Sequence, residues 1–327
     1  MSDLSVRYIG LDLRNPFVVS SCGLTGTLKG VAQCAAAGAG AVVLKSLFEE
    51  QIEAEIGVSD VRRDIDIHPE APDYLAELGK THAPRSYLQL IESARKEIDI
   101  PVIASVNCVS ARWWSEYARQ IEAAGASALE LNISIMPRSL DQEAAELEIA
   151  FYRIVDQVRK KVSLPITVKI GPYFTALPRV VDGIAKSGAD GVVLFNRFYQ
   201  LDVDAESLSL APGYQFSSQH EMHLPLRWVS ILAPQIGCDF AASTGIHSGT
   251  DAAKLILAGA TVVQLASVLY RQGVKHLSIM IQEFESWLDR HGFASAQEAC
   301  GTLAQSPSFQ PESLERLQYI KALTGLG

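Results

Sequence analysis

The sequence contains few cysteines and no cluster of residues with metal-binding spacing. Its five cysteines are scattered over 327 residues, and none belongs to a C-x-x-C pair. Its seven histidines show neither H-x-H nor H-E-x-x-H spacing. A disulfide framework, a zinc site and an iron–sulfur cluster all require closer or more regular spacing of their ligands. The sequence therefore predicts that the protein holds no metal.

Positive charge is scarce as well. The chain has 28 lysines and arginines against 37 aspartates and glutamates, which gives a formal net charge of -9. Such a chain has no basic excess with which to neutralise a phosphate backbone or an anionic lipid surface. An uncharged apolar run of about 18 residues is also lacking, and Asp3 and Arg7 interrupt the stretch where a secretory signal would be apolar. We therefore expect a cytoplasmic protein without nucleic-acid or membrane partners.

A joint between a helix and a buried strand recurs along the chain. In each case a helix ends in a small residue followed by Gly, and then come Ala and a run of aliphatic residues. The four segments are AAGAGAVVLKS at 36–46, AAGASALELNIS at 123–134, KSGADGVVLFN at 186–196 and LAGATVVQLAS at 257–267. Gly at a helix end adopts the left-handed conformation, and the run after it is too apolar to face water on either side. Four further apolar runs bring the predicted strands to eight: 16–21, 101–107, 165–171 and 238–244.

Eight alternations of strand and helix predict an α/β fold, a (β/α)8 TIM barrel that spans residues 1–327 as one domain. An open doubly wound sheet is the alternative, but no G-x-G-x-x-G follows any predicted strand. We expect a small strand pair outside the barrel at the N-terminus and a helix over 306–327 that packs on the outside. The long segments 47–83 and 197–221 are interpreted as lids or substrate walls, or else as surface insertions.

Polar side chains stand at the C-terminal ends of most predicted strands, where barrels of this kind carry their sites. Burial would disfavour these side chains unless a ligand or partner satisfied them. From the first strand to the eighth, the ends are Ser21-Cys22-Gly23, Lys45-Ser46, Asn107, Asn132 with Ser134, Lys169, Asn196-Arg197, Ser243-Thr244-Gly245 and Ala266-Ser267.

Two of these residues, Lys45 and Lys169, lie in strands that helices cover on the outside, so both are expected to point into the barrel mouth. The alternative is a lysine that reaches solvent or pairs with Glu130 across the barrel. Two lysines beside three asparagines suit a flat, polar, partly anionic ring system such as a reduced flavin. The loops after the last two strands can bind phosphate through backbone N–H groups, although Ser248 is also a plain helix cap.

Several short motifs stand in a characteristic order between about Asn15 and about Tyr270: NPF at 15–17, KS at 45–46, ELN at 130–132, VK at 168–169, PYF at 172–174, Asn196, TGI at 244–246 and GATVVQ at 259–264. In order and spacing they resemble the dihydroorotate dehydrogenase family, whose barrels bind flavin mononucleotide (FMN). In that family a general base removes a substrate proton while hydride passes to flavin N5. The resemblance also implies a small-molecule substrate, an electron acceptor of unspecified nature and a homodimer.

The resemblance assigns roles to the strand ends. It implies that Ser21, Cys22 and Gly23 approach the flavin through backbone atoms, that Lys45 and Ser46 lie at its ring, and that Lys169 reaches the N1/O2 edge. It implies flavin or substrate contacts at Asn107, Asn132 and Asn196, and phosphate contacts at Thr244, Gly245, Ala266 and Ser267.

The half of the site that would face the substrate departs from the family pattern. Asn132 is followed by Ile133-Ser134-Ile135-Met136-Pro137, so Ile135 occupies the position of the family's Cys or Ser base. The family's N-x-x-G-x-x-N loop is not found in 47–83. The sequence therefore predicts an FMN-dependent oxidoreductase that acts on CH–CH bonds of a small, pyrimidine-like substrate other than dihydroorotate.

Candidates for catalysis are Ser134, Lys45, Asn132 and Arg197, with Arg138, Glu49, Glu50 and His68 as further possibilities near the reacting carbon. Three alternatives remain open. The first is an authentic cytosolic dihydroorotate dehydrogenase with a displaced base. The second is a non-redox barrel enzyme that acts on a phosphate-bearing substrate through a lysine amine. The third is a protein that holds flavin without turnover.

Overall fold

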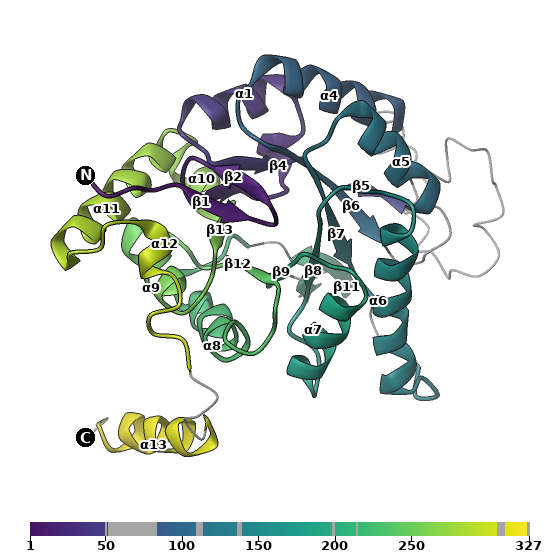
Figure 1. Cartoon of the computed structure of the whole chain (residues 1–327). Coiled ribbons are helices and arrows are strands. Elements are labelled where there is room, and N and C mark those ends of the chain that lie inside the picture. Colours follow the sequence, from purple (N-terminus) through teal and green to yellow (C-terminus); the bar gives the residue numbers. More distant parts are fainter. Residues whose placement is uncertain are drawn as a thin grey trace.

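The computed structural model describes residues 1–49, 51, 84–108, 114–135, 139–197, 200–213, 215–305 and 311–325. Its main sheet is a barrel of parallel strands inside a ring of helices (Figure 1). In chain order the barrel strands are β3 (Phe17–Val19), β4 (Ala41–Val43), β6 (Val102–Cys108), β7 (Ala128–Ile133), β8 (Ile166–Ile170), β9 (Gly191–Leu194), β12 (Asp239–Ser243) and β13 (Val262–Leu265). Each strand pairs with the next, and β13 pairs with β3, so the barrel closes. The prediction of a (β/α)8 barrel is confirmed.

The helices between the strands bury one apolar face each against the barrel. In α7, for example, Leu177, Val180, Val181 and Ile184 are buried at helical spacing while charged residues face outward. The helices in the described part of the chain are α1 (Leu28–Ala36), α4 (Pro84–Glu97), α5 (Trp114–Ala124), α6 (Ala144–Arg159), α7 (Leu177–Lys186), α8 (His223–Leu232), α9 (Gly249–Leu257), α10 (Ser267–Gln272), α11 (His276–His291), α12 (Ala296–Ala299) and α13 (Pro311–Thr324), with short 3₁₀ turns η1 (Gly23–Thr25) and η3 (Gln219–Met222). None of these helices is long and apolar enough to cross a membrane.

An antiparallel hairpin of β1 (Val6–Tyr8) and β2 (Leu11–Leu13) covers the N-terminal end of the barrel (Figure 1). At its turn, the backbone N–H of Ile9 donates to Asp239 Oδ2 at 2.5 Å. Asp239 begins β12, and the side chain of Ile9 also lies against Gly191 at the beginning of β9. The hairpin therefore lies at the end opposite the C-terminal strand ends, where the candidate site residues stand.

The segment 197–221 contains a second hairpin, of β10 (Gln200–Asp204) and β11 (Ser209–Gly213), which the sequence analysis did not predict. Its apolar side chains Leu201, Val203, Leu208 and Leu210 are exposed. In the segment 47–83, β5 (Leu47–Phe48) pairs with β6, and most of the remainder lies outside the described residues.

The C-terminal segment forms helix α13, which stands apart from the barrel in Figure 1. Its residues Leu317, Tyr319, Ile320 and Leu323 are exposed. The expectation that this helix packs on the outside of the barrel is therefore not met by the described residues. The backbone hydrogen bonds of a helix lie within its own segment, whereas packing also requires a complementary apolar surface elsewhere in the fold.

Candidate active site

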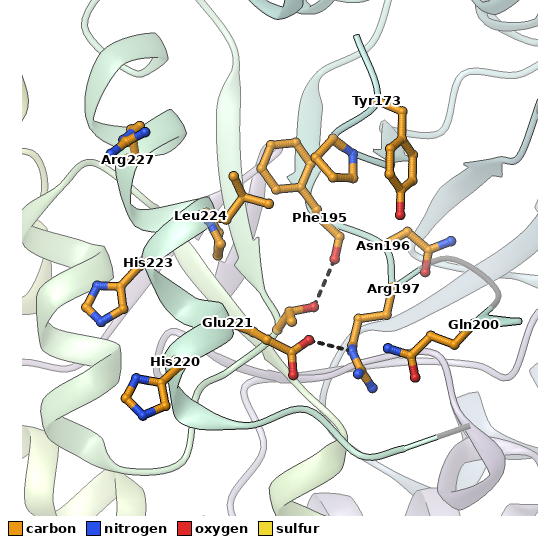
Figure 2. Close-up of a pocket in the computed structure, with 13 residues that line it drawn as sticks. Tyr173, Phe195, Asn196, Arg197, Gln200, His220, Glu221, His223, Leu224 and Arg227 are labelled. Atoms are coloured by element: carbon orange, nitrogen blue, oxygen red, sulfur yellow. Dashed lines mark hydrogen bonds and ion pairs between the residues drawn. The ribbon is translucent and has the colours of Figure 1, made fainter. Parts of the chain in front are cut away.

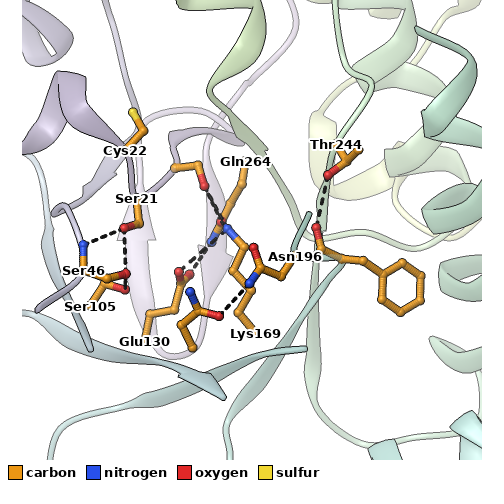
Figure 3. A network of polar contacts seen from close by, with 12 residues as sticks. Ser21, Cys22, Ser46, Ser105, Glu130, Lys169, Asn196, Thr244 and Gln264 are labelled. Atoms are coloured by element: carbon orange, nitrogen blue, oxygen red, sulfur yellow. Dashed lines mark hydrogen bonds and ion pairs between the residues drawn. The ribbon is translucent and has the colours of Figure 1, made fainter. Parts of the chain in front are cut away.

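Lys169, in β8, points into the barrel and is only 5% exposed. Its ammonium group donates hydrogen bonds to Ser20 Oγ at 2.9 Å and to Gln264 Oε1 at 3.1 Å (Figure 3). The Ser20 hydroxyl in turn donates to the same Gln264 oxygen. The side chain does not reach solvent, and it lines the cavity at the barrel mouth, as the sequence predicted.

Lys169 also pairs with Glu130, and Gln264 forms hydrogen bonds to both side chains. Glu130 Oε1 lies 4.0 Å from Lys169 Nζ, and both side chains are buried. Gln264 Nε2 donates to the other carboxylate oxygen, Glu130 Oε2, at 2.6 Å. Sequence reasoning missed the part played by Gln264, although an amide within the apolar run VVQL was a signal.

The predicted asparagines come together at one level of the barrel. Asn132 of β7 is in register with Asn107 of β6 and with Lys169 of β8. Asn196, just after β9, donates from Nδ2 to Asn132 Oδ1 at 2.9 Å (Figure 3). These contacts orient two amide groups beside the lysine, where they offer donors and acceptors to a flat polar ring.

On the other side of the mouth, three serines form a chain of hydrogen bonds. Ser21 Oγ lies 2.9 Å from Ser46 Oγ, which lies 2.7 Å from Ser105 Oγ. The backbone N–H of Ser46 also donates to Ser21 Oγ. Ser105 belongs to β6 and was not predicted, because its strand PVIASVN ends two residues later at the asparagine.

A cavity of about 90 Å³ gathers many of the predicted residues. They are Ser21, Lys169, Asn196, Arg197, Thr244, Gly245, Ala266 and Ser267. Ser46 and Asn132 join this group through their hydrogen bonds to Ser21 and Asn196. A cavity with a cation and amides on one side and turn residues on the other suits a ligand that is polar at both ends.

The turn after β12 has an unusual backbone. Thr244 has φ +85°, a conformation that is uncommon for any residue but glycine, and its hydroxyl donates to the Phe195 carbonyl at 3.1 Å. The next residue, Gly245, donates from its backbone N–H to Ser217 Oγ at 3.3 Å. The N–H of Ser217 donates to Ser267 Oγ at 3.0 Å. Ser217 thus connects the turns after β12 and β13, a role that the sequence did not reveal.

A larger cleft, of about 500 Å³, adjoins this cavity (Figure 2). Its walls include Tyr173, Gln200 and Leu224, and it shares Phe195, Asn196, Arg197 and Thr244 with the smaller cavity. Arg197 Nε donates to Glu221 Oε2 at 2.9 Å, and Arg197 also donates to the Gln215 carbonyl. The arginine is therefore held in place between the two spaces, with its charge matched by a carboxylate.

Other predicted residues lie at the edge of this arrangement. Cys22 and Gly23 adjoin Tyr270, and burial raises the pKa of the Cys22 thiol, so the thiol stays protonated at neutral pH. Lys45 lies beside Gly26, while Ser134 is half-buried at the end of β7.

Of the loop candidates, Glu49 is buried, whereas Glu50, His68 and Arg138 lie outside the described residues. Among the described residues, no group of three or more His, Cys, Asp or Glu side chains is arranged to hold a metal ion.

The structure is thus a (β/α)8 barrel with a polar cavity at the C-terminal ends of its strands. Residues 3–288 match the model of the family described as dihydroorotate dehydrogenase. The chain therefore belongs to the dihydroorotate dehydrogenase family, a family of flavin-dependent oxidoreductases, and the prediction of an oxidoreductase is confirmed.

Curated relatives match most of the chain. The catalytic subunit of dihydroorotate dehydrogenase B (NAD(+)) from Methanosarcina acetivorans is 28% identical over 89% of this chain and 93% of its own length. Its counterpart from Thermoplasma volcanium is 27% identical over 92% of this chain and 98% of its own length. Chloroplastic dihydropyrimidine dehydrogenase (NADP(+)) from Arabidopsis thaliana is 26% identical over 91% of this chain and 76% of its own length.

Proposed function

We propose that this chain binds FMN in the barrel mouth and transfers hydride between the flavin and a small, pyrimidine-like substrate. The observation that carries the proposal is the polar cavity between Lys169 with Asn196 and the turns at Gly245 and Ser267, together with the larger cleft of about 500 Å³ that adjoins it. FMN has a polar ring at one end and a phosphate at the other, and this donor set suits both. The proposal includes a single barrel domain, a homodimer and a cytoplasmic location.

Each group in the cavity has a separate task in this proposal. The Lys169 ammonium would hold the ring edge on which negative charge gathers during reduction, and it is already fixed by two hydrogen bonds. The Asn132–Asn196 pair would orient the ring, and Ser21 and Ser46 would bind its opposite side. The backbone at Thr244, Gly245, Ala266 and Ser267 would hold the phosphate. Bound FMN supplies the hydride-accepting atom, whereas the protein supplies position and charge.

The names of two relatives indicate the substrate class. Both dihydroorotate dehydrogenase and dihydropyrimidine dehydrogenase are named for reduced pyrimidine rings. This chain lacks the family's base, since Ile135 stands at that position. We therefore propose a related cyclic substrate with a different proton donor or acceptor, together with an electron acceptor that is a separate molecule.

The test is to purify the protein, record its visible spectrum and identify what it releases on denaturation. We expect flavin absorption bands and released FMN. Failure to take up flavin after reconstitution with excess FMN would overturn the proposal.

A charge placed in the phosphate end tests the orientation of the ligand. Ser267→Glu should abolish FMN retention, because a carboxylate would lie close to the phosphate and repel it. Ser278→Glu is the matched control, because it adds the same charge at an exposed position on α11. The measurement is the flavin content of the purified variants. If Ser267→Glu remains as yellow as its control, the phosphate lies elsewhere.

A further inference from the structure

Glu130 is a carboxylate inside the barrel that has no role in the function proposed so far. It lies on β7, two residues before Asn132, and is 1% exposed. One oxygen, Oε2, accepts a hydrogen bond from Gln264, while Oε1 has no hydrogen-bond partner among the described residues. Burial of a carboxylate with one unbonded oxygen costs free energy of folding.

Gln264 lies between this carboxylate and the lysine. Its amide oxygen accepts from Lys169 Nζ, and its amide nitrogen donates to Glu130 Oε2 (Figure 3). The ammonium and the nearer carboxylate oxygen stay 4.0 Å apart, longer than a direct charged hydrogen bond. The bridge thus keeps Lys169 from closing onto Glu130.

We infer that Glu130 and Gln264 are positioning residues that determine how much of the positive charge of Lys169 reaches the bound flavin. Glu130 opposes the field of the ammonium, and Gln264 holds the ammonium at the mouth instead of on the carboxylate. Both charges are buried, so water screens them little. The inference rests on the proposed function, in which Lys169 faces the flavin ring.

The two residues should act on the flavin in opposite directions. Reduction adds negative charge to the flavin, and the carboxylate of Glu130 disfavours it. Glu130→Gln removes this charge and should raise the midpoint potential of bound FMN. Gln264→Met removes the bridge, so the ammonium can move toward Glu130 and away from the ring, and the potential should fall.

The experiment measures the midpoint potential of FMN in the reconstituted protein and, separately, the Kd for oxidised FMN. For Glu130→Gln we expect reduced FMN to gain about tenfold in affinity relative to oxidised FMN, which is a rise of about 30 mV for a two-electron couple. Thr167→Val is the matched control. Thr167 is the register neighbour of Glu130 on β8, is equally buried and carries an unbonded hydroxyl but no charge. Its substitution should leave the potential unchanged.

A higher potential in Glu130→Gln and a lower potential in Gln264→Met support the inference, because a general loosening of the barrel would move both the same way, and shifts in the reverse directions overturn it. Equal potentials in the wild type and Glu130→Gln overturn it, as does a shift of the same sign in both variants. If Glu130→Gln fails to fold, Gln264→Met decides, and an unchanged or higher potential in that variant overturns the inference. A wild-type chain that takes up no flavin contradicts the proposed function itself, which is a separate result.

Discussion

Ile135 follows Ser134 directly after β7, where the dihydroorotate dehydrogenase family has a Cys or Ser base. The side chain is partly buried against the hydrophobic core and cannot accept a proton. General-base catalysis contributes about 10²–10⁴-fold to a rate, and each lost polar contact to the substrate costs about 1–3 kcal/mol more. Dihydroorotate should therefore be a poor substrate, with a combined deficit above about a thousandfold. Anaerobic mixing with the oxidised holoprotein, followed at the flavin band, measures the rate.

Bleaching within seconds at neutral pH would show that another group serves as the base and that dihydroorotate is the natural substrate. If bleaching is slow, Ile135→Cys alone should not restore it. The missing asparagine contacts would still leave the pyrimidine ring out of position.

The residues that sequence reasoning found and missed differ in how they are recognised. Lys169 was found because a charged residue within an apolar strand can be recognised from the sequence of that strand alone. Gln264 and Ser217 were missed because their importance depends on what lies opposite them. Gln264 meets Lys169 across the barrel, and Ser217 reaches Gly245 from a segment 28 residues away. Closure of the barrel decides such contacts, and local pattern does not.

Among the elements, the turn between β12 and α9 depends on a glycine in a way that can be measured. Gly245 has φ +77°, and a Cβ there would lie 2.3 Å from the backbone nitrogen of Met222. Gly292, after α11, has the same φ with open space around it. Gly292→Ala should cost about 1–2 kcal/mol of stability, because only backbone strain is added. Gly245→Ala should cost about 1–3 kcal/mol more, because the methyl group overpacks the turn.

Urea unfolding of the two alanine variants gives both free energies, and flavin content shows whether only Gly245→Ala also loses FMN. Equal losses of stability would mean that η3 moves aside freely to admit the methyl group. The turn would then be less rigid than the contact with Met222 indicates.

The barrel strands were predictable because each follows a Gly or Pro and consists mainly of buried apolar residues. The hairpin β10–β11 was not predicted, although QLDVD alternates polar and apolar residues. Its apolar side chains are exposed, and strand propensity without burial is a weak guide to structure. For the C-terminal helix α13, the sequence predicts the helix itself but not its position. Its formation follows from local sequence, whereas its distance from the barrel does not.

At the scale of the whole molecule, the N-terminal hairpin is attached to the end of the barrel by the hydrogen bond from the Ile9 N–H to Asp239. Burial raises the pKa of Asp239 above 3.8, so the folded chain keeps this proton at a pH at which the unfolded chain has lost it. The free energy of unfolding should therefore fall as pH rises from about 3.8 through the raised pKa. Asp239→Asn keeps an oxygen for the Ile9 N–H and removes the titration.

Denaturant unfolding of both proteins between pH 4 and pH 6 checks this prediction. The stability of Asp239→Asn relative to the wild type should increase across that range. A constant difference would show that Asp239 titrates alike in the folded and unfolded chains.

Strand β13 joins the two ends of the proposed site. Gln264 contacts Lys169, and Ser267, three residues later, accepts from Ser217 at the other end of the cavity. Gln264 lies in β13 and Ser267 begins α10, so this short stretch fixes the distance between the ring end and the phosphate end of the proposed site. One residue inserted after Leu265 would leave Gln264 in place and displace Ser267. In the proposed function, a flavin that lacks its phosphate, such as riboflavin, would engage one end only, so the barrel would select its ligand by length as well as by charge.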